Sequence, residues 1–127
     1  MTKGAFYERK AIQFLKLKGY KILEKNFRTP RGEIDIIGYD HSAVAFVEVK
    51  ARDRSSWIGP EEAVTKTKQK RLLNAARMYN AIHGDKHYRF DVVSIIQGTQ
   101  WRVYRLIKNA FTPLESPGIY GRNDRRR

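Results

Sequence analysis

The sequence predicts a single α/β domain, in which helices flank a mixed sheet of five strands in the order α-β-β-β-α-β-β. Three observations support this fold class. Five segments are rich in β-forming residues, two longer segments show helical periodicity, and turns with Gly or Pro separate most of them. The 127 residues suit one domain with a buried core, and no internal repeat interrupts the order.

The first helix is expected from Gly4 to about Gly19, because a glycine commonly ends a helix. Its polar arc consists of Arg9, Lys10, Gln13 and Lys16, and its apolar arc of Tyr7, Ala11, Ile12, Phe14 and Leu15. Glu8 lies in the middle of the apolar arc, where a carboxylate is costly to bury unless it is paired or binds a metal. Glu8 is therefore either a third acid of a metal site or the partner of Lys18 or Arg28.

Three strands are expected after this helix. The first runs from Tyr20 to Phe27, and residues 28–32 form a turn because they contain Pro and Gly. The two clearest strands are Glu33–Tyr39 and Ala43–Ala51, and Asp40-His41-Ser42 between them is the turn of a tight hairpin.

A polar loop and a long helix follow. The loop, Arg52–Gly59, carries Trp57, which is interpreted as a loop anchor or as a base-stacking residue beside Arg52 and Arg54. The helix is expected from Pro60 to about His83, with two glutamates in its first turn favoured by the helix dipole. Its buried side consists of Val64, Leu72, Ala75, Ala76, Tyr79 and Ile82.

The last two strands are Tyr88–Ile96 and Gln100–Lys108. Asp91, in the first of them, either orients a site or pairs with an arginine. Residues 1–111 therefore make up the domain, and residues 112–127 form a basic tail that is expected to be flexible and that ends in three arginines.

The net charge is the first functional observation. Lys and Arg total 26 against 13 acidic residues, a formal charge of +13. Such an excess attracts polyanions, so we expect a nucleic acid as partner, with DNA favoured and RNA as the alternative; the plainer interpretation is a well-solubilised or ribosome-associated surface. The candidate nucleic-acid-binding residues are Arg28, Arg31, Arg52, Arg54, Lys66, Lys68, Lys70 and Arg71.

Composition also excludes several classes of site. Cysteine is absent, which rules out disulfides and Cys-based zinc sites, and the three histidines are interpreted as surface residues. No apolar stretch reaches membrane-spanning length, and the N-terminus lacks the pattern of a signal peptide. A cytoplasmic location without a membrane partner is expected.

The central hairpin brings acidic residues together. If its turn is centred between His41 and Ser42, the facing pairs are Asp35 with Glu48, Glu33 with Lys50, and Ile37 with Phe46. Because strand side chains alternate, these six share one face. The opposite face would be the core, and it consists of Ile34, Ile36, Ala45, Val47 and Val49.

Two acids on facing strand positions repel each other unless a cation lies between them. Mg²⁺ or Mn²⁺ is the expected cation, because hard cations prefer carboxylate oxygens together with water and phosphate. Lys50, on the same face, could hold a phosphate oxygen or activate a water, so the cluster suits hydrolysis of a phosphodiester. Two alternatives remain open: Glu33 and Lys50 form an ordinary cross-strand ion pair, or Asp35 lies on a solvated face.

Several motifs carry a family resemblance. Gly32-Glu33-Ile34-Asp35 and Phe46-Val47-Glu48-Val49-Lys50-x-Arg52 resemble the D…E-x-K signature of the PD-(D/E)XK nuclease superfamily, with Ile34 in place of the usual Pro. The whole chain as far as Asn109-Ala110-Phe111 resembles the bacterial YraN-like family. Its pattern also includes the following residues: Glu8, Gly19-Tyr20, Asn26-x-Arg28, Lys68 and Arg89-Phe90-Asp91-Val92-Val93.

The resemblance implies a restriction-endonuclease-like core, similar to that of archaeal Holliday-junction resolvases, and a magnesium-dependent endonuclease acting on DNA. It implies metal-binding roles for Glu8, Asp35 and Glu48, catalytic roles for these three and Lys50, and a homodimer as one assembly. Glu33 and Asp91 are auxiliary candidates. The alternative function is a non-catalytic DNA- or RNA-binding module that retains the nuclease fold.

Overall fold

The computed structural model describes residues 1–56, 64–84 and 86–112. Its elements are α1 (Lys3–Leu17), β1 (Lys21–Thr29), β2 (Gly32–Asp40), β3 (Ala43–Asp53), the short 3-10 helix η1 (Arg54–Ser56), α2 (Lys66–His83), β4 (Tyr88–Gln97) and β5 (Arg102–Ile107). The predicted order of helices and strands is confirmed. The predictions for Trp57 and for the tail beyond Thr112 lie outside the described residues.

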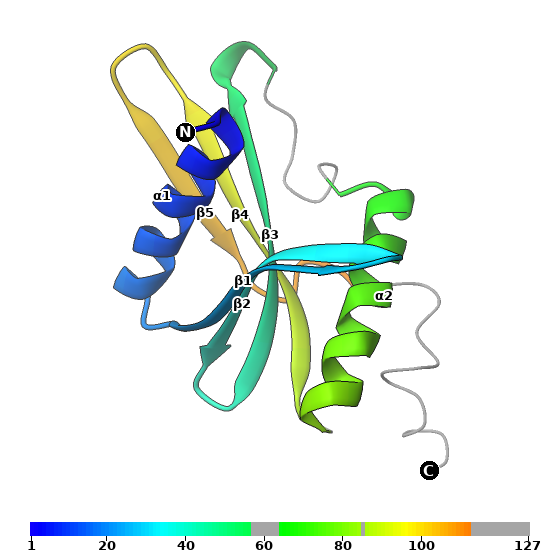
Figure 1. Cartoon of the computed structure of the whole chain (residues 1–127). Coiled ribbons are helices and arrows are strands. Elements are labelled where there is room, and N and C mark those ends of the chain that lie inside the picture. The colour runs from blue at the N-terminus through cyan, green and yellow to red at the C-terminus, as the bar shows by residue number, and fades with distance from the viewer. Residues whose placement is uncertain (57–63, 85, 113–127) are drawn as a thin grey trace.

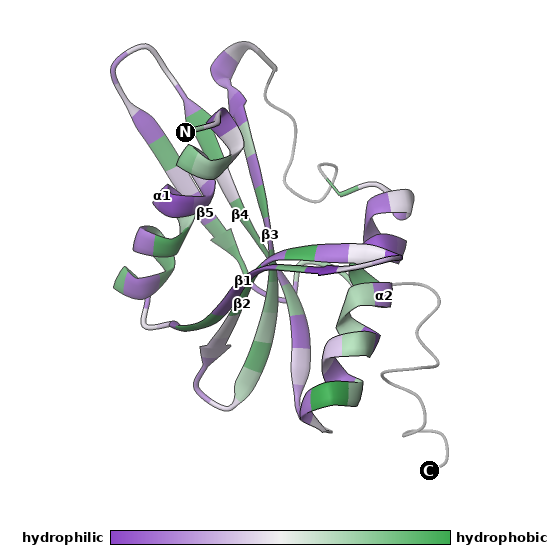
Figure 2. Ribbon diagram, in the orientation of Figure 1, coloured by the Kyte–Doolittle hydropathy of each residue, from purple (hydrophilic) through white to green (hydrophobic). Residues whose placement is uncertain are grey.

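The five strands form one sheet in the order β1-β2-β3-β4-β5. Only the neighbours β3 and β4 are parallel, and the other pairs are antiparallel, so the sheet is mixed as predicted. Helix α1 lies on one face and α2 on the other (Figure 1). In Figure 2 the central parts of the strands are largely hydrophobic, whereas α1 alternates between hydrophobic and hydrophilic residues.

Both faces of the central hairpin are therefore core. The cluster under α1 includes Ile36, Ala45 and Val47, and the cluster under α2 includes Ile37 and Phe46. The prediction of a single core face was wrong, because each face is covered by a different helix, so both sets of alternating apolar residues are buried.

Strand β2 turns away from β3 half-way along its length. The ladder between them runs from Asp40 and Ala43 to Ile36 and Val47, whereas β1 and β2 stay paired as far as Thr29 and Gly32. The end of the β1–β2 hairpin thus leaves the sheet and crosses to α2 (Figure 1, cyan).

This divergence corrects two further predictions. Glu33 does not face Lys50; it pairs with Arg28 on β1, at 3.5 Å between the guanidinium Nε and a carboxylate oxygen. Ile34 packs in the α2 cluster with Ile37 instead of sharing the face of Ile36. Simple alternation fails here because β2 changes direction between these residues.

Gly32 fixes the contact between the hairpin and α2. A Cβ atom at this position would lie 1.9 Å from the main-chain oxygen of Arg71, and the Asn74 amide nitrogen donates to the Arg31 carbonyl nearby at 3.3 Å. Only a residue without a side chain allows the two backbones to approach this closely.

Replacing Gly32 by Ala is expected to destabilise the fold by about 1–3 kcal/mol, because the methyl group would push the hairpin off α2. The measurement is urea unfolding followed by circular dichroism. Gly4→Ala in α1 is the matched control: nothing lies within 4 Å of that position, so its stability should stay equal or rise. Equal stability of the two variants would show that the close approach is unimportant.

Helix α2 ends at His83 as predicted, but it differs from its prediction at its N-terminal end and in its buried residues. It begins at Lys66, after Thr65, whose hydroxyl accepts a hydrogen bond from the Lys68 backbone at 3.1 Å. Residues 60–62, expected in its first turn, lie outside the described residues. Ile82, predicted as buried, is 61% exposed, and the residue of this last turn that packs on Tyr79 is His83, with 4.1 Å between the ring centres. Leu73 is buried although it was not predicted to be.

Candidate functional site

The candidate site lies where β2 leaves β3. Beyond Val47 the edge of β3 has no backbone partner from β2 in the described ladder. The Asp35 side chain takes that place, because its Oδ2 accepts a hydrogen bond from the backbone N–H of Val49 at 2.9 Å. Asp35 is thus held beside β3 by a main-chain contact, and Glu48 precedes Val49 on that strand.

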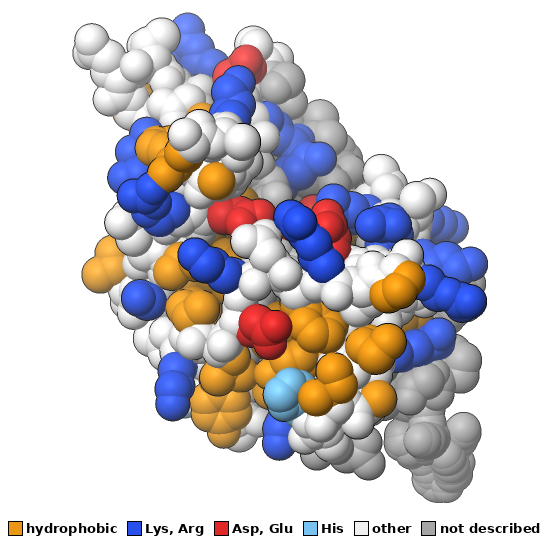
Figure 3. Space-filling model, in the orientation of Figure 1, with side chains coloured by type: hydrophobic (Ala, Val, Ile, Leu, Met, Phe, Trp, Pro, Cys, Tyr) orange, Lys and Arg blue, Asp and Glu red, His pale blue; other side chains and the backbone are white. Residues whose placement is uncertain are grey.

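A pocket of about 350 Å³ opens at this edge. Its lining comes from the start of α1, from β2 and β3, and from α2, and it consists of Lys3, Gly4, Tyr7, Glu8, Asp35, Glu48, Val49, Lys50, Ala51 and Lys68. We call it the carboxylate pocket. The space-filling view shows acidic side chains in the middle of this face, with Lys and Arg around them (Figure 3).

The two central acids contact each other. Asp35 and Glu48 are joined by a side-chain hydrogen bond, and Glu48 is only 5% exposed. Burial and then the charge of Asp35 raise the pKa of Glu48 to about 8. Burial also raises the pKa of Asp35, although its hydrogen bond from Val49 opposes this. At neutral pH the pair therefore retains a proton or requires a cation.

Lys68 supplies one positive charge to this pair. Its Nζ lies 3.2 Å from Glu48 Oε2, and although partial burial lowers the pKa of Lys68, the charges of Glu48 and Asp35 outweigh that effect and raise it. The sequence assigned Lys68 to an exposed phosphate-binding surface, and helical periodicity gave no sign of this contact. The family pattern was the signal, because it includes Lys68 together with the acids.

Glu8 lies at the rim of the acid pair. Burial and then the nearby Asp35 charge raise its pKa. With its amide nitrogen turned toward Glu8, Asn26 donates to both carboxylate oxygens at 3.1 and 3.3 Å. Within the described ranges, Glu8 forms no ion pair within 4 Å with Lys18 or Arg28, although the charge of Arg28 acts on Glu8 and lowers its pKa against the effect of burial.

The donor set fits a hard divalent cation held mainly by two carboxylates. Among the residues that the structure describes, no three Asp, Glu, His or Cys side chains gather closely enough to enclose a metal ion. Asp35 and Glu48 nevertheless form a buried acid pair that holds a proton near neutral pH, and a cation can take the place of that proton. Mg²⁺ is commonly bound by one or two carboxylates plus water and phosphate, so Glu8 would act through water.

The site lies within a family match. The model described as "Uncharacterised protein family UPF0102" matches residues 7–95, which include Glu8, Asp35, Glu48, Lys50 and Lys68. The chain belongs to this family. The match confirms the YraN-like resemblance that the sequence motifs indicated.

Two relatives illustrate how far the UPF0102 similarity extends. A protein from Clostridium botulinum (strain Kyoto / Type A2) is 44% identical over 113 residues, which cover 85% of this chain and 92% of the relative. A protein from Desulfosudis oleivorans is 48% identical over 106 residues, covering 82% of this chain and 85% of the relative. Both are named UPF0102 protein, and that name states no activity.

Of the other predicted cations of this UPF0102 chain, Lys50 alone is among the residues that line the carboxylate pocket. Arg52 is half-buried two residues further along β3. The remaining predicted cations are exposed, and they are Arg28, Arg31, Arg54, Lys66, Lys70 and Arg71. Their exposure allows contact with a polyanion. Within the described residues, no helix is both long enough and apolar enough to cross a membrane.

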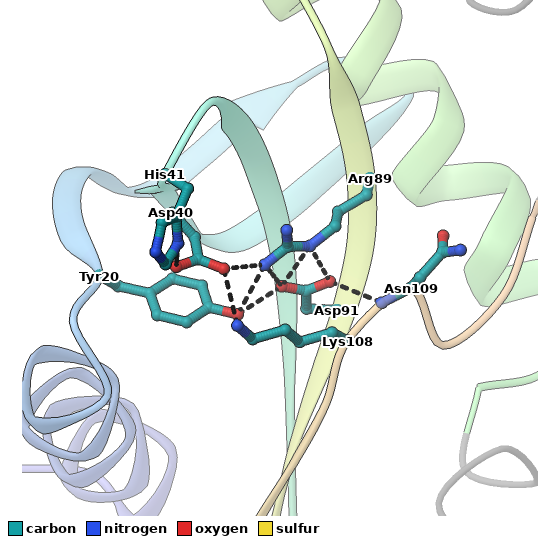
Figure 4. Close-up of polar contacts among 7 residues, drawn as sticks. All are labelled: Tyr20, Asp40, His41, Arg89, Asp91, Lys108 and Asn109. Atoms are coloured by element: carbon teal, nitrogen blue, oxygen red, sulfur yellow. Dashed lines mark hydrogen bonds and ion pairs between the residues drawn. The ribbon is translucent and has the colours of Figure 1, made fainter.

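Asp91 belongs to a different cluster (Figure 4). It is fully buried, and its Oδ1 accepts from Arg89 Nε and from the Asn109 backbone, both at 2.9 Å, while its Oδ2 accepts from the Tyr20 hydroxyl at 2.7 Å. Arg89 also reaches Asp40, at 2.6 Å. Of the two interpretations of Asp91, pairing with an arginine is confirmed.

The acid pair predicts an unusual dependence of stability on pH. Because the pKa of Glu48 is raised from 4.5 to about 8, the folded chain binds a proton more tightly than the unfolded chain between these values. In EDTA, the free energy of unfolding should therefore fall by about 1 kcal/mol or more as the pH rises from 4.5 to 8. Glu48→Gln should remove this fall in the free energy of unfolding. The measurement is urea unfolding at a series of pH values. A dependence identical in both proteins would contradict the raised pKa.

Proposed function

We propose that the chain is a Mg²⁺- or Mn²⁺-dependent endonuclease that hydrolyses phosphodiester bonds in DNA. One observation carries this proposal: Asp35 and Glu48 meet in a pocket that also contains Lys50 and Lys68. A buried pair of acids is costly for the fold. It is useful where a cation and a phosphate must be brought together.

Five of the pocket residues have a role in the proposed reaction. Asp35 and Glu48 would hold the cation directly, and Glu8 through water. A bound Mg²⁺ supplies positive charge beside the scissile phosphate and lowers the pKa of water. Lys50 would stabilise the charge that develops on the phosphate or position the attacking water. The Val49 N–H keeps the Asp35 carboxylate oriented throughout, through the bond at 2.9 Å.

Nucleic-acid binding would come from the basic surface around the pocket. The exposed lysines and arginines of α2, together with Arg52 and Arg54 after the pocket, would contact backbone phosphates. The resemblance to archaeal resolvases suggests branched DNA as substrate and a homodimer as the active assembly, in the cytoplasm. RNA is the alternative polymer, because phosphate contacts do not depend on the sugar.

A cleavage assay tests the proposal. Labelled duplex, forked and four-way DNA and a matched RNA are incubated with the chain in Mg²⁺, in Mn²⁺ and in EDTA. We expect cleavage of DNA with either metal and none in EDTA. Absence of cleavage on every substrate with both metals would reject the endonuclease.

A non-catalytic nucleic-acid-binding module is the second candidate. The ion pair between Lys68 and Glu48, at 3.2 Å, favours it, because a lysine already neutralises one acid without a metal. If this candidate is correct, the chain binds DNA or RNA with an affinity that falls as the salt concentration rises. The cleavage assay then shows no products.

A further inference from the structure

The tip of the β4–β5 hairpin holds an exposed aromatic ring in a fixed position. Trp101 is 42% exposed, and its indole packs on Gly98, where a Cβ atom would lie 2.1 Å from the ring. The Gly98 N–H donates to the Trp101 carbonyl at 2.8 Å, which closes the hairpin. Exposing a large rigid ring costs hydrophobic free energy, so a ligand that stacks on it would recover that cost.

A hollow of about 410 Å³ lies beside this ring and is lined by Gln97, Thr99, Gln100, Trp101, Arg102 and Tyr104. We call it the Trp101 hollow. Its side chains offer the aromatic face of Trp101, the Thr99 hydroxyl and the Gln100 amide, while Gln97 and Arg102 are held in place by hydrogen bonds to their neighbours. An aromatic face stacks on a nucleobase, and hydroxyl and amide groups hydrogen-bond to its edges.

The Trp101 hollow is connected to the carboxylate pocket through the first turns of α1. Tyr7 lines the pocket, and its hydroxyl donates to Gln97 Oε1 in the hollow at 3.1 Å. The neighbouring Phe6 ring lies under the Arg102 guanidinium, 5.4 Å from its centre. The N-terminal end of α1 lies beside the upper parts of β4 and β5 (Figure 1). One DNA strand could therefore contact both places.

The sheet register gives the distance between the Trp101 hollow and the acid pair of the carboxylate pocket. Gln97 pairs with both Arg102 and Asp53, and Asp53 lies further along β3 than Glu48. At about 3.3 Å per residue, the hollow lies roughly 16 Å along the strands from the acids. That is about five steps of a DNA strand in a duplex, and fewer steps of a more extended single strand.

We propose that the Trp101 hollow binds an unpaired base of the DNA strand that is cut at the carboxylate pocket. The inference rests on the proposed function and adds a substrate class: DNA with unpaired bases a few nucleotides from the cut. A base inside a duplex is stacked between its neighbours and cannot lie on the indole, whereas any unpaired base can. The hollow therefore selects structure instead of sequence.

Equilibrium binding in EDTA tests this inference without depending on cleavage. The full chain is titrated into labelled forked DNA and into fully paired DNA of equal length, followed by fluorescence anisotropy. Trp101→Ala is expected to weaken binding of the fork about 10- to 100-fold and to leave duplex binding unchanged. Trp101→Phe should retain most of the affinity, because it keeps an aromatic face.

Val103→Ala is the matched control, since Val103 lies on the same hairpin and is 46% exposed. It should bind both DNAs like the wild-type chain. Circular dichroism checks that each variant is folded. An equal loss of fork and duplex binding in Trp101→Ala, or no loss, would overturn the inference. Because EDTA prevents metal-dependent cleavage, fork-specific loss would support the hollow even if the cleavage assay rejected the nuclease.

Discussion

Replacing Asp35 by Asn, or Glu48 by Gln, is expected to slow DNA cleavage by about 10³-fold or more. Each change removes one of the two charges that would hold the cation while keeping the size of the side chain. In the Asp35→Asn variant the new amide oxygen can still accept the Val49 N–H bond, so the bend of β2 should persist. The measurement is the single-turnover rate on labelled DNA in Mg²⁺.

A matched control separates catalysis from general charge effects. Glu24, exposed on β1, also carries a carboxylate, and Glu24→Gln should cleave at the wild-type rate. All three variants should bind DNA in EDTA at least as well as the wild-type chain, because none of them gains a negative charge. Near-normal cleavage by both the Asp35 and the Glu48 variant would rule out these residues as the catalytic acids.

Replacing Arg89 by Met is expected to lower the free energy of unfolding by about 3–5 kcal/mol. Arg89 pairs with two carboxylates that are almost fully buried, Asp40 and Asp91. The substitution would leave Asp91 without a cation, while Asp40 would keep only Lys108, at 2.9 Å, and His41. The measurement is urea unfolding at neutral pH.

Two further variants test the physical reason for this loss. Arg105→Met removes an exposed arginine from β5 and should change stability by less than about 0.5 kcal/mol. Adding Asp91→Asn to Arg89→Met should restore part of the lost stability, because the uncompensated charge disappears. If Arg89→Met lowered the free energy of unfolding as little as Arg105→Met does, the cluster of Arg89, Asp40 and Asp91 would contribute little to stability.

The sequence predicted the elements well because local signals specify them. Gly19, with φ +96°, follows the end of α1 as expected, and the two-residue turn at His41 and Ser42 sets the hairpin register. That register confirms the pairing of Ile37 with Phe46. Asp35 and Glu48 lie just beyond the end of the ladder, and they meet through their side chains instead of as paired strand residues. Glycine positions and turn length act over a few residues, so a sequence shows them directly.

The surroundings of the acids depend on tertiary contacts, which the sequence does not show. Alternation assumes a regular strand, but β2 separates from β3 at Asp35, so Glu33 is paired within its own hairpin and Ile34 changes face. Lys68 reaches Glu48 only because α2 packs across this bend. The choice between the two interpretations of Asp91, orienting a site or pairing with an arginine, likewise depended on where the ends of four strands meet.

The binding of Mn²⁺ tests the central claim most directly. The chain is titrated with Mn²⁺ at pH 7, and the concentration of free Mn²⁺ is measured by electron paramagnetic resonance. The protons released on binding are measured in weakly buffered solution. Since the pKa of Glu48 is about 8, we predict one ion per chain and release of up to about one proton. Asp35→Asn and Glu48→Gln should lose the site. Absence of binding, or binding unchanged in both variants, would contradict the assignment of this acid pair as a cation site.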